Sequence, residues 1–320
     1  MLEKFKEYGY LKYKKIRYII NKRKTKKKSR HITKDDLISD LEKIGIKKGD
    51  VLLVHSSLKR IGYVIGGAKT VIEALLDVIG KEGTLLMPTY PLNARMLQLC
   101  ESKNYIFDLN TTPTYMGAIP SEFLKIEGIY RSIHPTHSVS AIGKYANEIT
   151  KDHHIGHKTY GENSPWGKIK KLDGKILGIG VSLHVNAQYH YLEDMLGEDF
   201  PLKVKVDKIY KVKCRVDNKD IFVEVQPNDP EVAKTRIDTK ENSFIRNYFW
   251  EIFENLGVSR IGKIGEATSW WANFREFYNI LFKLAKLEIT IYSTEDELKA
   301  KKLYPFLSIK DYFINSMNKE

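Results

Sequence analysis

Cysteine is scarce in this sequence, and long apolar runs are missing from it. The two cysteines, Cys100 and Cys214, lie far apart, which fits neither a cysteine metal cluster nor a disulfide scaffold and favours a reducing, cytoplasmic setting. No apolar stretch approaches the roughly 20 residues that a bilayer-spanning helix needs. Charges interrupt the N-terminal apolar residues, which argues against a secretory signal. We expect a cytoplasmic protein, and no metal, because the histidines show no ligand spacing on a predicted helix.

What remains is the ordinary composition of a soluble globular protein. Hydrophobic residues make up 42% and charged residues 29% of the 320 residues, which argues against wholesale disorder. A chain of this length is expected to form one large domain or two smaller ones, with a sizeable core.

The positive charge is concentrated at the N-terminus. Of the net charge of +13, residues 1–30 carry +11 and the remaining 290 residues carry +2. Tyrosines and isoleucines lie among these lysines, which suits a helix on an anionic membrane surface, a segment that grips a nucleic acid or a solvated arm. We assign residues 1–32 to a basic tail or helix that can associate with the inner face of the membrane, and residues 33–320 to the folded domain. No nucleic-acid partner is expected.

Residues 51–76 form the stretch around which the chain is organised. The apolar run Val51–Val54 predicts a buried strand of a parallel sheet. His55-Ser56-Ser57 ends that run, and a loop containing Gly66-Gly67 leads to a helix that begins near Ala68. Glycines allow close backbone approach and first-turn N–H groups point toward a ligand, so this unit can bind an anion such as phosphate. The same glycines could also simply turn the chain.

Strand and helix patterns alternate along the rest of the chain. Buried strands are predicted at residues 83–88 and 174–180, a long functional loop or lid at 91–114, and an antiparallel hairpin at 203–225. This order predicts an α/β layered sandwich with a central, mostly parallel sheet flanked by helices, plus a small antiparallel β insertion. Helices are predicted at residues 31–48, from 68, at 116–125, from 165, and at 185–195, 243–256 and 272–287, with a short strand and turn at 259–267.

His190 and Glu193 are candidates for acid–base chemistry. They are three residues apart, so on a helix they share a face, and the carboxylate can hold the imidazole and raise its basicity. The pair follows the predicted strand 174–180, and ligands of α/β proteins usually bind beyond the carboxyl ends of such strands. A histidine packed in the core or paired on the surface would give the same spacing.

Several separate motifs follow one another over about residues 33–290. They are His55-Ser56-Ser57-Leu58, Gly62, Val64-Ile65-Gly66-Gly67-Ala68, Pro88-Thr89-Tyr90, Met116-Gly117, Arg131-Ser132-Ile133-His134-Pro135-Thr136-His137-Ser138, Gly161-Glu162-Asn163-Ser164-Pro165 and His190-Tyr191-Leu192-Glu193. In this order and spacing the chain resembles the aminoglycoside 3-N-acetyltransferase family, also called the antibiotic N-acetyltransferases. The resemblance implies an α/β sandwich unrelated to the commoner acetyltransferase fold.

This resemblance implies acetyl transfer from acetyl-CoA to an amine on a sugar. His190 would be the general base and Glu193 its orienting partner, because a protonated amine cannot attack a thioester. Backbone N–H groups, Ser56, Ser57 or Thr89 would stabilise the oxyanion. The resemblance assigns coenzyme binding to His55, Ser56, Ser57, Gly66, Gly67, Ala68, Thr89 and Ser138, and acceptor binding to Tyr90, His134 and His184.

One departure from the family pattern concerns the acceptor. Family members that act on aminoglycosides commonly carry Asp four residues after the strand glycine, where this chain has His184. A near-neutral body would steer a polycation weakly. We therefore expect an amino sugar linked to a nucleotide or a lipid, as in surface-glycan synthesis. The alternatives are an aminoglycoside acetyltransferase that confers resistance and a non-catalytic binding module that uses the basic tail. An oligomer is compatible with the sequence.

Overall fold

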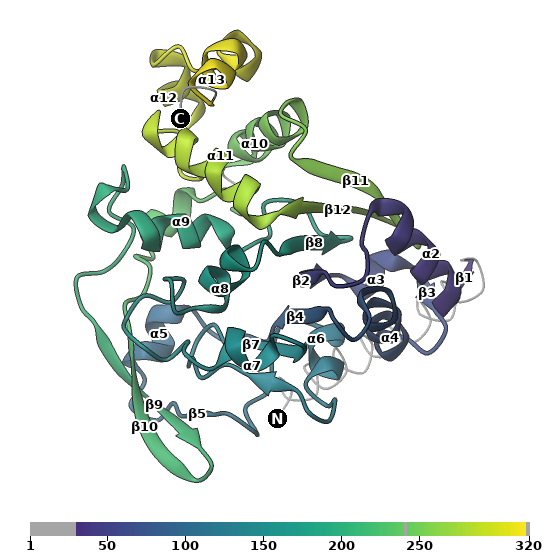
Figure 1. Ribbon diagram of the computed structural model, residues 1–320. Helices are drawn as coiled ribbons and strands as arrows, with labels where there is room; N and C mark the ends of the chain where they lie inside the picture. Colours follow the sequence, from purple (N-terminus) through teal and green to yellow (C-terminus); the bar gives the residue numbers. More distant parts are fainter. Residues whose placement is uncertain (1–29, 240–241, 318–320) are drawn as a thin grey trace, which may run out of the picture.

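A computed structural model describes residues 30–239 and 242–317 (Figure 1). The basic segment 1–29 lies outside the described residues, so its association with a membrane surface stays a prediction. Among the described helices, none is both long and apolar enough to cross a membrane.

A seven-stranded sheet forms the centre of the molecule, with the strand order β11-β12-β8-β2-β4-β7-β6. Strand β2 is parallel to β4 and to β8, whereas the other four pairings in this sheet are antiparallel. The α/β class is confirmed, but the prediction of a mostly parallel sheet is wrong outside the three central strands. The strands are β2 (Val51–Ser56), β4 (Thr84–Pro88), β6 (Tyr130–Arg131), β7 (Val139–Gly143), β8 (Lys175–Ile179), β11 (Ser259–Ile264) and β12 (Ala267–Asn273).

Helices cover both faces of this sheet (Figure 1). Apolar side chains from one set of helices form one core with the sheet, and those from a second set form another. The first set is α2 (Lys34–Ile44), α4 (Ala68–Ile79) and α6 (Ala118–Phe123). The second set is α7 (Ala146–Thr150), α8 (Pro165–Lys171), α9 (Gln188–Leu196), α10 (Ser243–Asn255), α11 (Phe274–Lys286), α12 (Glu295–Ala300) and α13 (Lys310–Met317).

Strand β2 explains why both faces must be covered. Val51 and Leu53 point into the core beneath α8, α9 and α11, whereas Leu52 and Val54 point into the core beneath α2, α4 and α6. Alternate side chains of a strand face opposite sides of its sheet, so a run of four apolar residues indicates a strand buried on both faces.

Capping side chains fix several helix starts. Thr33 and Asp36 form a capping box at the start of α2, which supplies partners for N–H groups that the first turn leaves free. Ser164 caps α8 and Pro165 occupies its first turn. Helix α2 is shorter than predicted, because His31 and Ile32 form β1 (His31–Ile32), which pairs with β3 (Tyr63–Val64).

The sequence pattern did not reveal strand β12. Residues 259–267 were expected to be a short strand and turn, with a helix from residue 272. Instead, β11 and β12 form a hairpin, and β12 pairs along β8 in the central sheet. Trp270 packs into one core and Trp271 against the other. Large apolar side chains therefore face both sides of β12, and the alternation that marks a half-buried strand is absent.

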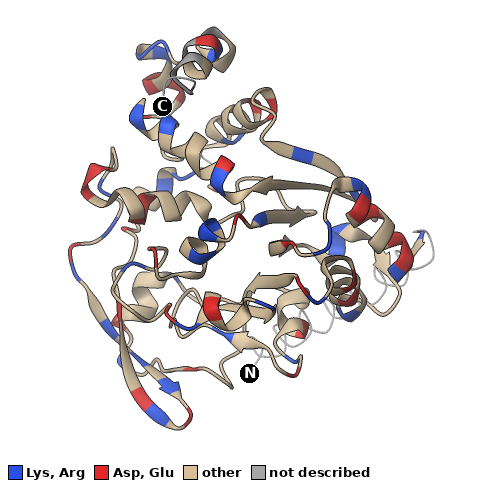
Figure 2. Ribbon diagram, in the orientation of Figure 1, with Lys and Arg blue, Asp and Glu red and all other residues tan. Residues whose placement is uncertain are grey.

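The predicted antiparallel hairpin is confirmed and projects from the body (Figure 1). It comprises β9 (Tyr210–Val216) and β10 (Lys219–Val225), joined by Asp217-Asn218, both with positive φ. Such a two-residue turn matches the twist of the paired strands. The predicted loop 91–114 contains α5 (Met96–Glu101) and β5 (Phe107–Asp108), and β5 adds to β9 as a third strand. Basic and acidic residues alternate along the described chain, without a long segment of one sign (Figure 2).

Candidate active site

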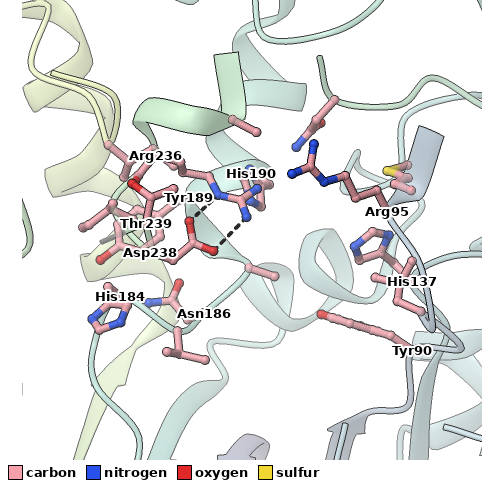
Figure 3. A pocket seen from close by; sticks show the side chains of 18 of the residues that line it. Tyr90, Arg95, His137, His184, Asn186, Tyr189, His190, Arg236, Asp238 and Thr239 are labelled. Carbon is pink, nitrogen blue, oxygen red and sulfur yellow. Dashed lines mark hydrogen bonds and ion pairs between the residues drawn. The ribbon is translucent and has the colours of Figure 1, made fainter. Parts of the chain in front are cut away.

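A cavity of about 870 Å³ lies beyond the carboxyl ends of the three parallel strands. His55 near the end of β2, Tyr90 after β4 and the segment 184–190 after β8 all line it. Residues 92–97 and 228–239 complete its walls (Figure 3). Open α/β sheets place ligands at this edge because neighbouring parallel strands end there together.

His190 and Glu193 form the pair that their spacing predicts. His190 Nδ1 lies 2.7 Å from Glu193 Oε2, and the Glu193 carboxylate is buried. Its second oxygen, Oε1, accepts a hydrogen bond of 2.9 Å from the Tyr292 hydroxyl. Because Nδ1 is engaged by the carboxylate, Nε2 is the imidazole nitrogen left to exchange a proton with a ligand.

The turn between β8 and α9 brings His190 to the cavity wall. Gly180 has a φ of 65°, and a Cβ atom there would lie 2.8 Å from the Cβ of Arg60, so a glycine is required at this close approach. Asn186 then holds the start of α9, since its Oδ1 accepts a hydrogen bond of 3.0 Å from the Gln188 N–H and its Nδ2 donates to the Leu183 carbonyl. His190 follows in the first turn of α9.

Aromatic and imidazole rings pack side by side behind His190. The His190 ring lies 5.3 Å from the Tyr160 ring, which lies 5.2 Å from the ring of His137. His137 contacts Tyr90 in turn, with 4.7 Å between ring centroids. Burial, followed by the positive charge that His190 would carry, holds the pKa of His137 well below its ordinary value. His137 is therefore neutral and acts in the cavity wall as a polar, uncharged ring.

Two of the predicted residues present polar atoms in the cavity wall that lack partners. The Nε2 atom of His55 and the hydroxyl of Tyr90 are both buried and have no hydrogen-bond partner. Burial lowers the pKa of His55 to about 4 and raises that of Tyr90, so both side chains are neutral. A buried polar group without a hydrogen-bond partner lowers the stability of the folded protein. A ligand in the cavity can supply the missing partners.

Charged residues also line the cavity. Arg236 donates two hydrogen bonds to Asp238, at 2.7 and 2.8 Å (Figure 3). Burial opposes the charged form of Asp238, but these bonds outweigh that cost and its pKa lies below the ordinary value. Arg95 extends into the cavity from the other side (Figure 3). Lys234 also lines it, and among the described lining residues Asp238 is the one carboxylate.

The cavity contains some of the predicted site residues and not others. His55, Tyr90, His184 and His190 line it, and Glu193 lies directly behind His190. His134 is buried outside the wall, stacked on His153 with 4.4 Å between ring centroids, and burial lowers its pKa. The lining does not include the other predicted residues, which are Ser56, Ser57, Gly66, Gly67, Ala68, Thr89 and Ser138.

Those residues have other surroundings. The Thr89 hydroxyl donates to the Ser138 carbonyl and contacts the Ser140 hydroxyl, in a fully buried network. Gly66-Gly67-Ala68 forms the start of α4 as predicted. This helix start lies on the face of the sheet that α2, α4 and α6 cover, and it does not line the cavity. The roles assigned to these residues stay predictions.

Sequence reasoning missed much of the cavity wall. Arg95 lies within the loop 91–114, which was predicted to be functional, so its position carried a signal. Arg236 and Asp238 lie in a stretch between the hairpin and α10 for which no motif stood out. Tyr292 is also without a local signal, because the turn after α11 alone brings its hydroxyl to Glu193.

The fold and the cavity define a mixed α/β protein in which an imidazole, backed by a buried carboxylate, faces a space large enough for a substrate. A family model described as aminoglycoside 3-N-acetyltransferase matches residues 53–286. The chain belongs to the aminoglycoside 3-N-acetyltransferase family, as its motifs indicated.

Individual relatives agree with this membership. The chain is 31% identical to an SPbeta prophage-derived aminoglycoside N(3')-acetyltransferase-like protein, YokD, of Bacillus subtilis, over 60% of this chain and 79% of that protein. It is 27% identical to aminoglycoside N(3)-acetyltransferase IX of Micromonospora chalcea, over 75% and 88% respectively. A solved structure of AAC-IIIb in a binary complex with CoASH is similar with a TM-score of 0.70 and 25% identity, covering 83% of this chain and all of that chain.

Family membership confirms the predicted class of enzyme, an acetyl-CoA-dependent N-acetyltransferase. Among the described residues, no group of three or more metal-ligating side chains is arranged to hold a metal ion. The cavity suits a coenzyme with an apolar arm, because its wall includes apolar side chains such as Leu92, Met116 and Ile291.

Proposed function

We propose that this protein transfers the acetyl group of acetyl-CoA to an amino group of an aminoglycoside, with His190 as the general base. The His190–Glu193 pair on the wall of a substrate-sized cavity is the observation that carries this proposal. The names of the relatives support the aminoglycoside, which was the alternative to a nucleotide- or lipid-linked sugar.

In the proposed reaction, His190 Nε2 removes a proton from the acceptor amine as its nitrogen attacks the thioester carbonyl. The C–N bond forms, the C–S bond breaks, and the proton leaves on the departing thiol. Glu193 fixes the ring through Nδ1 and stabilises the imidazolium that forms. The unpartnered His55 and Tyr90 groups are in a position to orient the acetyl group or the acceptor.

Replacement of the base tests this proposal. His190→Ala is expected to reduce kcat by about 10²- to 10⁴-fold and to leave acetyl-CoA binding intact, because the imidazole acts on the acceptor. Release of free CoA with an aminoglycoside such as gentamicin measures turnover, and calorimetry with acetyl-CoA measures binding. His31→Ala, a change at an exposed histidine that does not line the cavity, is the matched control and should keep full activity. Full turnover in His190→Ala would exclude the base assignment.

A second acceptor class is favoured by one specific observation. The described cavity wall carries Arg95, Lys234 and Arg236 against the single carboxylate of Asp238. A wall of this charge attracts an anion more readily than a polycation. An amino sugar that bears a phosphate, such as one linked to a nucleotide or a lipid, is therefore the second candidate acceptor.

A panel of acceptors separates the two candidates. The ratio of kcat/KM between an aminoglycoside and a nucleotide-linked amino sugar is measured at low and at high salt. The first proposal requires faster turnover of the aminoglycoside. Faster turnover of the phosphate-bearing sugar, weakening as salt rises, would assign the enzyme to the second class.

A further inference from the structure

The chain beyond helix α11 reaches back to the catalytic pair. Residues 288–293 form a tight turn directly after α11, and this turn lies outside the residues 53–286 that the family model matches. Ile291 lines the cavity, and the next residue, Tyr292, places its hydroxyl on the carboxylate behind the base. A segment outside the family match therefore touches the catalytic pair.

Both oxygens of the Glu193 carboxylate have defined partners. Oε2 lies 2.7 Å from His190 Nδ1, and Oε1 accepts a hydrogen bond of 2.9 Å from the Tyr292 hydroxyl. The Glu193 side chain is fully buried, so each oxygen that lost its partner would remain unsolvated. The contacts with His190 and Tyr292 together fix the plane of the carboxylate. The orientation of this plane sets the orientation of the imidazole ring that contacts it.

Tyr292 is itself held as a hydrogen-bond donor. The residue is buried, with 6% of its surface exposed. Burial and the neighbouring Glu193 charge raise its pKa well above the ordinary value, so the hydroxyl keeps its proton.

The turn around Tyr292 is closed by its own side chains. The Thr290 N–H donates to the Ser293 hydroxyl at 2.9 Å, and the Tyr292 N–H donates to the Thr290 hydroxyl at 3.2 Å. Asn242, at the start of α10, donates to the Ser293 carbonyl at 3.3 Å. These bonds fix the backbone from which the tyrosine ring extends.

We propose that Tyr292 is a positioning residue of the acetyl transfer, which acts by holding the Glu193 carboxylate in the orientation that aligns His190. The inference rests on the proposed role of His190 and deepens it. It assigns a function in catalysis to the C-terminal segment beyond the part that defines the family.

Removal of one hydroxyl group tests this role. Tyr292→Phe is expected to lower kcat about tenfold, in line with the loss of one hydrogen bond to a charged group, while the KM values for acetyl-CoA and the acceptor change less than twofold. A residue that only supports the fold would not separate kcat from KM in this way. Tyr278→Phe is the matched control on α11, since its ring packs against Tyr191 and Lys170 away from the cavity, and it should leave kcat unchanged.

A double-mutant cycle then shows whether the tyrosine acts through the carboxylate. In a Glu193→Ala background, the additional change Tyr292→Phe should alter kcat by less than twofold, because the side chain that Tyr292 orients is already gone. An equal loss in both backgrounds would overturn the inference, as would wild-type kcat in Tyr292→Phe. Should Tyr292→Phe alone fail to fold, Thr290→Ala provides a second test, because it removes the hydroxyl that accepts a hydrogen bond from the Tyr292 N–H. A loss of kcat with unchanged KM values would support the inference, and wild-type kcat in Thr290→Ala would overturn it.

These outcomes are distinct from failure of the proposed function. An inactive wild-type enzyme across the acceptor panel would refute the acetyl-transfer proposal itself. An active wild type whose kcat is insensitive to Tyr292→Phe would refute the positioning role alone.

Discussion

At the scale of single residues, buried neutral histidines set how the protein responds to acid. His153 is buried, and both of its ring nitrogens are engaged, Nδ1 with the Ser132 hydroxyl and Nε2 with the Thr159 carbonyl, each at 2.8 Å. Burial lowers the pKa of His153 to about 3. Its ordinary pKa is 6.5, so below pH 6.5 the unfolded chain binds a proton at this residue that the folded chain excludes.

The consequence is a loss of stability on acidification. Above pH 6.5 the contribution of His153 is fully present, and it is lost progressively as the pH falls from 6.5 toward 3. At pH 5 this loss is about 2 kcal/mol of unfolding free energy. Urea unfolding at pH 7.5 and pH 5.0 measures it. The difference between the two pH values should shrink by about that amount in His153→Gln and stay unchanged in the exposed-histidine control His31→Gln. Equal pH dependence in wild type and His153→Gln would contradict the assignment.

The residues of the active site differ in how far the sequence alone reveals them. His190 and Glu193 are neighbours on a helix, so their spacing in the sequence already predicts their contact. Tyr292 and Arg236 reach the site through tertiary packing, and no local spacing encodes such a contact. The resemblance to a family identified residues at which the chain turns, such as Gly66-Gly67, but it could not tell which of them face the cavity.

At the scale of elements, the contact between β8 and β12 depends on a missing side chain. Gly178 of β8 lies opposite Trp270 of β12, and the indole N–H donates to the Val181 carbonyl at 2.9 Å. A Cβ atom on Gly178 would lie 2.3 Å from the indole nitrogen. The indole can occupy its buried place because residue 178 has no side chain.

A methyl group added at this contact should destabilise the folded protein. Gly178→Ala is expected to lower the unfolding free energy by about 1–3 kcal/mol, because both the rigid indole and the strand backbone are confined in the core. Denaturant unfolding monitored by tryptophan fluorescence measures the change. Gly262→Ala on β11 is the control: its Cβ would approach the Ile44 side chain at 3.1 Å, which can give way. Equal losses of unfolding free energy in Gly178→Ala and Gly262→Ala would contradict the prediction that the rigid indole makes the first substitution more destabilising.

Element types were predictable where local patterns are strong, and strand pairing was not. Thr33, Ser164 and Pro165 mark helix starts by chemistry that acts within one turn. The direction of a strand depends on its connection. Strands β2 and β4 are linked through helix α4 and run parallel, whereas the short turn between β11 and β12 permits only an antiparallel hairpin.

At the scale of the whole molecule, the cavity joins segments that are far apart in the chain. Its wall includes His55 near the N-terminal end of the domain, the loop with Arg95, the start of α9, and Ile291 near the C-terminal end. A ligand that binds across these segments stabilises all of them at once, because it binds the folded chain and not the unfolded one.

Acetyl-CoA is therefore expected to raise the melting temperature. At about 100 times its dissociation constant, a ligand adds about 2.7 kcal/mol to the unfolding free energy, which corresponds to an increase of several degrees. Differential scanning fluorimetry with and without acetyl-CoA measures this. His190→Ala should show the same increase, since the base is not needed for binding. No shift in the wild-type protein at saturating acetyl-CoA would contradict coenzyme binding to this fold.

The β11–β12 hairpin at one edge of the sheet also has a consequence for synthesis on the ribosome. Strand β8 is complete at residue 179, but its second neighbour, β12, is not translated until residue 273. If β8 folds before residue 273 is translated, the edge that β12 covers has no partner, and unpaired edges can recruit other chains. Fragments that end before residue 273 are therefore expected to aggregate when they are expressed.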